Sequence, residues 1–141
     1  MARGYSYVQM LMVISLLAIL AAASSPYYFS WQQRQQVRST SSMLLADLRL
    51  TQSRSMQREQ NTTWSILVED SAKQYHVMSG ANAYQTITYP DSIVVSASPT
   101  DEVEFAGLTG AVAVASTITI TSSNLSSASD TITINAAGVM E

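Results

Sequence analysis

The sequence predicts an α+β protein in which one long N-terminal helix packs on a small antiparallel β-sheet domain. Three features support this class. The 30 residues between Arg3 and Arg34 carry no charged side chain. Apolar residues then recur at helical spacing as far as Met56, and beyond Asn61 the pattern changes to the alternation that is typical of β-strands.

The charge-free segment is long enough to cross a lipid bilayer, for which about 20 apolar residues suffice. Residues 10–23 are almost all Met, Leu, Val, Ile and Ala. A buried core helix is the alternative, but such helices are usually shorter and amphipathic. Pro26 removes one helical hydrogen bond and crowds the preceding turn, so we expect a kink or a locally melted turn near residues 22–26.

Four aromatic residues follow the proline: Tyr27, Tyr28, Phe29 and Trp31. Such amphipathic rings favour the headgroup level of a membrane, where they form an interfacial belt. An aromatic core cluster is the alternative interpretation.

The second half of the helix carries a narrow apolar stripe, which needs a partner that covers it. The stripe consists of Val37, Leu44, Leu45, Leu48 and Met56. Five arginines occupy much of the remaining surface, and we interpret them as a solvated face: Arg34, Arg38, Arg49, Arg54 and Arg58. We therefore predict one helix over residues 5–60, with residues 5–31 as its membrane-embedded part.

A β-rich domain is expected over residues 61–141. Runs rich in β-branched residues predict strands at 62–69, 73–79, 84–89, 92–98, 116–121 and 130–135. Loops are expected at 79–83, 90–91, 99–102 and 122–129. Alternating Thr and Ile in the last two strands favour a sheet with one buried and one wet face.

Residues that could carry chemistry are sparse. Cysteine is absent, which excludes disulfides and thiolate chemistry. His76 is the only histidine, so a catalytic triad or a histidine-rich metal site is not expected. The acidic residues near Asp101 match no calcium-binding loop. We expect no enzymatic activity, no catalytic residue, no cofactor and no metal.

The charge distribution disfavours nucleic acid as a partner. The net charge is -3, and all seven basic residues lie at or before Lys73. Residues 74–141 carry six carboxylates and no Lys or Arg, a surface that repels polyanions. Binding to DNA is therefore not expected.

The N-terminal pattern resembles the type IV pilin and pseudopilin family. A short polar leader ends in Gly4, an aromatic residue follows, and a charge-free helix leads to a proline and a β-rich second half. The resemblance implies that a prepilin peptidase cuts between Gly4 and Tyr5 on the cytoplasmic side and methylates the new amine of Tyr5. Residues 1–4 would then be the leader, and Pro26 would be the twenty-second mature residue, where many family members carry proline.

The second half is similar to the GspH/FimT branch of that family. The similarity rests on VEFAGLTG (103–110), STITITSS (116–123) and DTITINAAG (130–138), a turn with Phe and Gly, two alternating strands and a late glycine. It implies a structural minor pseudopilin of a type II secretion system. A minor pilin of a type IV pilus, serving adhesion, motility or DNA uptake, is the first alternative. A membrane-anchored binding domain is the second.

The implied partners are other pilin or pseudopilin subunits, the prepilin peptidase, an inner-membrane assembly platform and the lipid bilayer. The implied location is the bacterial inner membrane, crossed once with the N-terminus cytoplasmic and the β domain periplasmic, and then a filament.

Two features depart from the family pattern. The family usually has glutamate as the fifth mature residue, thought to pair with a neighbour's terminal amine, whereas this chain has Gln9, which can hydrogen-bond without neutralising a charge. Arg34 and Arg38 also follow the apolar segment, so the positive-inside rule alone favours the opposite orientation. We side with the family orientation because its insertion depends on dedicated machinery.

Overall fold

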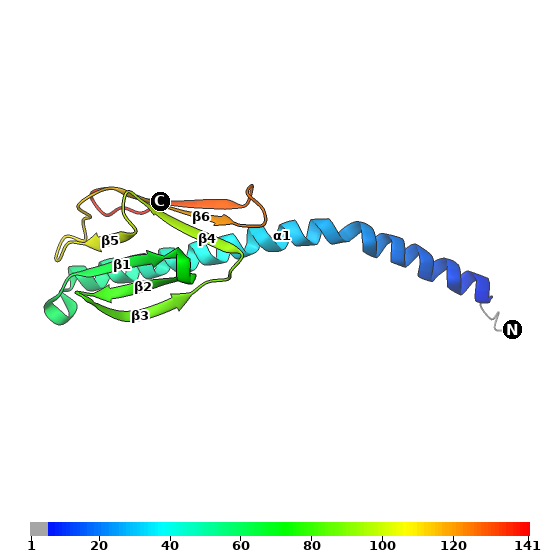
Figure 1. Ribbon diagram of the computed structural model, residues 1–141, viewed down its shortest axis with the longest axis horizontal. Coiled ribbons are helices and arrows are strands. Elements are labelled where there is room, and N and C mark those ends of the chain that lie inside the picture. The colour runs from blue at the N-terminus through cyan, green and yellow to red at the C-terminus, as the bar shows by residue number, and fades with distance from the viewer. Residues whose placement is uncertain (1–5) are drawn as a thin grey trace. The chain divides into compact units, whose positions relative to one another are not determined.

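The computed structural model describes residues 6–141 and contains one long helix and seven strands (Figure 1). The helix α1 spans Tyr7–Met56. Two 3-10 turns follow, η1 at Glu59–Asn61 and η2 at Asp70–Ala72. The strands are β1 (Trp64–Glu69), β2 (Gln74–Ser79), β3 (Asn82–Thr88), β4 (Ile93–Ser98), β5 (Glu102–Phe105), β6 (Ser116–Ser122) and β7 (Ser129–Ile134).

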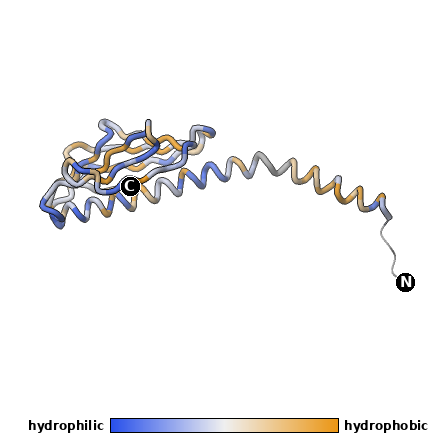
Figure 2. Tube along the Cα trace, turned by 60° about the horizontal axis from the view of Figure 1, so that its bottom comes forward, coloured by the Kyte–Doolittle hydropathy of each residue, from blue (hydrophilic) through white to orange (hydrophobic). Residues whose placement is uncertain are grey.

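The chain divides into two compact units, with the boundary between Gln32 and Gln33. The first unit contains the N-terminal part of α1. The second contains the rest of α1 and every described strand. Figure 2 shows hydrophobic colour predominating in the first part of α1 and mixed colours in the part that runs beside the strands.

Helical structure is unbroken through Pro26, because α1 is one continuous element. The expectation of a melted turn near residues 22–26 is therefore wrong. A proline removes only one backbone donor, and the remaining hydrogen bonds of α1 continue on both sides of it. The kink at Pro26 stays a prediction.

Two antiparallel sheets form the β domain. Their strand orders are β3-β2-β1-β5 and β4-β6-β7. In the first sheet Ile66 is opposite Val77 on β2 and Val103 on β5. In the second, Ile118 is opposite Ala97 and Ile132. The antiparallel arrangement confirms the predicted fold class, while the division into two sheets was not predicted.

Strand alternation in β6 and β7 follows the sequence closely. Ile118, Ile120, Ile132 and Ile134 are buried, whereas the intervening threonines are exposed or half-buried. This confirms the expected sheet with one covered face.

Strand β5 is the element that the sequence interpretation missed, since residues 99–102 were expected to be a loop and 103–110 a turn. Val103 and Phe105 are buried, and Glu102 and Glu104 point outward. Four residues are too few for a reliable periodic signal, and pairing with β1 is what makes this segment a strand.

The apolar stripe of α1 is covered by the sheets, as predicted. Val37, Leu44 and Leu48 are buried at 2%, 0% and 0% exposure. Leu45 is partly buried against the same core, but Met56 remains 41% exposed where the helix ends. The stripe therefore forms one wall of the core.

Polar contacts join α1 to the sheets beside this apolar core. The Tyr75 hydroxyl donates to Asp47 Oδ2 at 2.5 Å. The Ser122 hydroxyl donates to Gln33 Oε1 at 2.8 Å, in a buried contact. These side chains have no partner within their own element, so the helical pattern gave no sign of them.

The last turns of α1 meet two loops at a glycine junction. Gln52 Nε2 donates to the carbonyl oxygens of Gly110 at 2.9 Å and Gly138 at 2.8 Å. Ser55 donates to the carbonyl of Phe105 at 2.7 Å. Gly110 and Gly138 have φ values of +65° and +81°, which favour glycine, and both are buried. The loops that contain Gly110 and Gly138 thus both contact the side chain of Gln52.

Arg54 does not belong to a solvated face, which corrects the sequence interpretation. Its guanidinium carbon lies 5.1 Å from the ring centre of Trp64 and 4.7 Å from that of Tyr84. It also pairs with Glu59 at 3.5 Å. The rings come from β1 and β3, so only the folded sheet brings them over the arginine.

Asp70 connects the two sheets. Its Oδ1 accepts hydrogen bonds from the backbone N–H of Val95 and the hydroxyl of Tyr89, both at 3.0 Å, and Lys73 pairs with both carboxylate oxygens at 3.0 Å. Burial opposes ionisation of Asp70, but the hydrogen bonds from Val95, Lys73 and Tyr89 together lower its pKa. Burial, followed by the bond to this carboxylate, raises the pKa of Tyr89.

Candidate functional site: an uncovered apolar helix

The start of α1 is capped by Gln9. The backbone N–H of Ser6 donates to Gln9 Oε1 at 3.1 Å, and the Ser6 carbonyl accepts from the N–H of Gln9 at 2.9 Å. A residue of this type three positions after serine forms one half of a capping box. Ser6-x-x-Gln9 ahead of an apolar run was a readable signal for this contact, and the sequence interpretation missed it.

The large apolar side chains that follow Gln9 on α1 are exposed. The exposed fractions of the large hydrophobic residues between Tyr7 and Leu20 range from 49% at Leu11 to 76% at Tyr7. None of the most apolar stretch of α1 is buried, and by length and composition it could cross a membrane. A continuous surface of this kind far exceeds the apolar patches of soluble monomers. It requires lipid or other apolar helices around it.

The aromatic residues after Pro26 are also exposed, which rejects the aromatic core cluster. Tyr27, Tyr28, Phe29 and Trp31 are exposed at 79%, 66%, 48% and 59%. Tyr28 and Trp31 contact each other as a tilted pair with centroids 6.0 Å apart. Rings that present both apolar faces and polar groups suit the boundary between hydrocarbon and water.

The predicted site residues do not form one cluster. Gly4 and Tyr5, the expected cleavage position and methylation residue, lie outside the described residues. Gln9 lies in the first turn of α1, and Pro26 lies more than four turns further along the same helix. The candidate site is therefore a surface along a helix.

His76 is part of the strand surface. Its Nδ1 lies 2.9 Å from Thr86 Oγ1 on the neighbouring strand, and its Nε2 lies 3.2 Å from Glu69 Oε2. Gln74 also contacts Glu69, and these two hydrogen bonds, that of Gln74 first, lower the pKa of Glu69. These contacts join side chains of the adjacent strands β1, β2 and β3.

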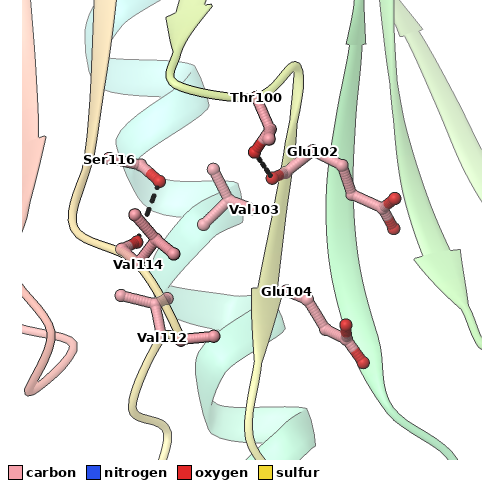
Figure 3. A pocket seen from close by; sticks show the side chains of 8 residues that line it. Thr100, Glu102, Val103, Glu104, Val112, Val114 and Ser116 are labelled. Carbon is pink, nitrogen blue, oxygen red and sulfur yellow. Dashed lines mark hydrogen bonds between the residues drawn. The ribbon is translucent and has the colours of Figure 1, made fainter.

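A cavity of about 240 Å³ lies beside β5 and is shown in Figure 3. Its lining residues are Thr100, Glu102, Val103, Glu104, Val112, Ala113, Val114 and Ser116. The two glutamate side chains point away from Val112 and Val114, and Glu102 accepts a hydrogen bond from Ser65 at 2.7 Å. The hydroxyls of Thr100 and Ser116 are bonded to nearby carbonyls. This cavity offers no acid, base or nucleophile aimed at a common point.

A long helix whose first half is apolar and exposed, and whose second half packs against two antiparallel sheets, defines the pilin fold. The structure is similar to the type IV minor pilin FimU of Pseudomonas aeruginosa PAO1 in two crystal forms. One has a TM-score of 0.64 over 79% of this chain and 90% of FimU, and the other 0.60 over 74% and 90%, each at 16% identity.

The structure is also similar to EpsH, a minor pseudopilin from the type 2 secretion system of Vibrio cholerae. The TM-score is 0.58 at 9% identity, over 75% of this chain and 94% of EpsH. At these identities the similarity concerns the fold, and it confirms the predicted pilin-like architecture. No protein-family model and no curated protein sequence matches this chain.

Proposed function

We propose that this chain is a structural, non-enzymatic subunit of a filament of the pilin and pseudopilin type, held in the inner membrane by α1 before assembly. One observation carries the proposal: the apolar half of α1 is exposed, while the other half packs one face against the β domain. Lipid would cover the first half before assembly, and the helices of neighbouring subunits would cover it afterwards. Ala18, Ala21 and Ala22 would permit close approach of such helices.

Within this class we propose a minor pseudopilin of a type II secretion filament. Processing would remove residues 1–4, methylate Tyr5 and require the prepilin peptidase and an assembly platform. The N-terminus would be cytoplasmic and the β domain periplasmic. The fold shared with EpsH and the GspH/FimT-like pattern of residues 103–138 support this proposal.

A minor pilin of a type IV pilus is the second candidate, and the similarity to FimU favours it. A role in DNA uptake receives little support, because residues 74–141 carry six carboxylates and no Lys or Arg. Arg54 is also engaged by Trp64, Tyr84 and Glu59. A deletion strain distinguishes the two candidate systems. Loss of protein secretion with normal piliation supports the type II secretion filament, whereas loss of piliation with normal secretion supports the type IV pilus.

Intact-mass analysis of membrane-extracted protein tests the class itself. The mature chain should lack residues 1–4 and carry one methyl group. Gly4→Leu should leave unprocessed precursor in the membrane, because a cleft shaped for the smallest residue excludes a bulky one. A wild-type chain that retains residues 1–4 would indicate a membrane-anchored domain with an uncleaved signal anchor instead.

A further inference from the structure

A second cavity, of about 380 Å³, lies between α1 and the chain around the start of β7. Its lining residues are Arg34, Val37, Arg38, Ser127, Ser129 and Asp130. All of them belong to the compact unit that begins at Gln33. The cavity is thus a feature of the folded β domain and its helix.

Arg34 and Arg38 are four residues apart, so their side chains lie on the same face of the helix. Within residues 6–141 neither guanidinium takes part in an ion pair, and the hydroxyls of Ser127 and Ser129 make no side-chain hydrogen bond. The cavity therefore presents two cations and two hydroxyl groups with unused donors. Guanidinium forks and hydroxyls are the groups that bind a phosphate oxyanion in proteins.

Asp130 is the one carboxylate in the lining, and it opposes an anionic ligand. Its Oδ1 accepts the backbone N–H of Thr131 at 3.0 Å, which directs that oxygen toward its own strand. With two arginines against one aspartate, the formal charge of the lining residues remains positive.

The sequence position of the cavity suggests the source of the phosphate. The charge-free part of α1, from Tyr7 to Gln33, extends about 40 Å as a helix. The hydrocarbon core of a bilayer is about 30 Å thick and the whole bilayer about 40 to 45 Å. The exposed aromatic residues Tyr27, Tyr28, Phe29 and Trp31 come shortly before Arg34 in the chain, and such rings favour the membrane interface. Arg34 and Arg38 therefore fall at the level of the lipid headgroups.

We propose that this cavity binds the phosphate of an anionic phospholipid headgroup on the β-domain side of the membrane. The inference rests on the proposed membrane-held state of the chain. Binding would fix the domain against the lipid surface until assembly withdraws the helix. Binding of the phosphate also explains the position of Arg34 and Arg38 on the periplasmic side, which the positive-inside rule disfavours. The anionic headgroup would offset their charge there.

The full chain, reconstituted in mixed phosphatidylcholine and phosphatidylglycerol bilayers and then extracted into detergent, provides the test. Native mass spectrometry counts the lipid molecules retained on each protein. The wild type should retain phosphatidylglycerol in preference to phosphatidylcholine. Arg34→Gln together with Arg38→Gln should reduce that preference about thirtyfold, given the attraction of about 1 kcal/mol that each basic residue contributes at an anionic surface.

Two further variants make the test specific. Arg49→Gln removes one charge from an exposed arginine that lies on the same helix outside the cavity, so it should leave the preference unchanged. Asp130→Asn should increase the preference, because it removes the only repulsive group. This opposite effect cannot result from unfolding. Soluble glycerol phosphate, at the phosphate concentration of the lipid, should not displace the bound lipid.

Equal retention by the double variant and Arg49→Gln would overturn the proposal. Displacement of the lipid by glycerol phosphate would also overturn the proposal, because it would identify a site for a free phosphate ester. Copurification of an acidic subunit with the wild type but not with the double variant would overturn it as well. The same spectra report cleavage after Gly4. A cleaved chain without lipid preference contradicts only the lipid site, whereas an uncleaved chain with the preference contradicts only the filament role.

Discussion

The phenolic oxygen of Tyr75 lies 2.5 Å from Oδ2 of Asp47 and donates a hydrogen bond that joins β2 to α1. The Tyr75 side chain is fully buried, and burial, followed by the bond to Asp47 and its charge, raises the pKa of the hydroxyl. The hydroxyl therefore stays protonated and remains a donor at any physiological pH.

Tyr75→Phe should lower the free energy of unfolding by about 1 to 2 kcal/mol, because Asp47 loses its donor where it is half-buried. Tyr84→Phe is the matched control: the Tyr84 ring contacts Trp64, and its hydroxyl makes no hydrogen bond within residues 6–141. Urea-induced unfolding of the full chain in detergent measures both. Equal losses in the two variants would show that the Tyr75–Asp47 bond contributes nothing specific.

Gly138→Ala should lower the free energy of unfolding by about 2 kcal/mol or more. The residue has a φ of +81°, and a Cβ atom would overlap the carbonyl oxygen of Gly110 and crowd Gln52. Gly107→Ala is the control, since its nearest neighbours would lie at 3.8 Å and its φ is not positive. Thermal unfolding distinguishes them, and a fully stable Gly138→Ala would mean that the junction tolerates rearrangement.

The stability of the β domain should fall in acid because of Asp70. Its pKa is lowered from 3.8 in the folded chain, so its contribution is complete above that value and is lost as pH falls through the lower folded pKa. The free energy of unfolding, measured from about pH 5 to about pH 2, should therefore decrease less steeply in Asp70→Asn than in the wild type. Glu69→Gln changes the adjacent carboxylate, which is more exposed than Asp70, and should retain most of the slope. A slope equal in Asp70→Asn and the wild type would contradict the role of Asp70.

A fragment of residues 33–141 should be soluble, folded and monomeric at micromolar concentration. It begins at the unit boundary, retains the buried Val37, Leu44 and Leu48, and lacks the uncovered apolar segment. Size-exclusion chromatography and urea unfolding test this expectation. A fragment that aggregates or unfolds without cooperativity would show that the domain depends on the preceding helix.

Gln9→Glu should raise the share of this subunit in sheared filaments, and Gln9→Leu should change assembly little. A neutral glutamine can cap Ser6 but cannot cancel a terminal amine, whose uncompensated charge in a membrane costs roughly 2.5 to 3.5 kcal/mol. The wild-type subunit should therefore be scarce or terminal. Quantitative mass spectrometry of filaments from the three strains measures this. Dominance of the wild-type subunit, or loss of assembly in Gln9→Leu alone, would disprove it.

Local patterns in the sequence were sufficient for the elements that depend on neighbouring residues. The charge-free segment predicted a helix with no protein core around it, because transfer to lipid depends on composition along a single helix. The spacing of Val37, Leu44 and Leu48 predicted the covered face of α1, and the Thr-Ile alternation predicted β6 and β7. In each case one periodic property along one segment determines which side is buried.

Only the tertiary structure decided which distant segments meet. Gln52 bonds to residues 58 and 86 positions away, and no pattern around Gln52 anticipates these partners. Strand β5 exists because β1 supplies its hydrogen bonds, and Arg54 leaves the solvated face because two rings from different strands cover it. Arg34 and Arg38 line a cavity only because the start of β7 lies beside them. Such contacts depend on strand order and sheet packing, which the periodicity of a single segment does not encode.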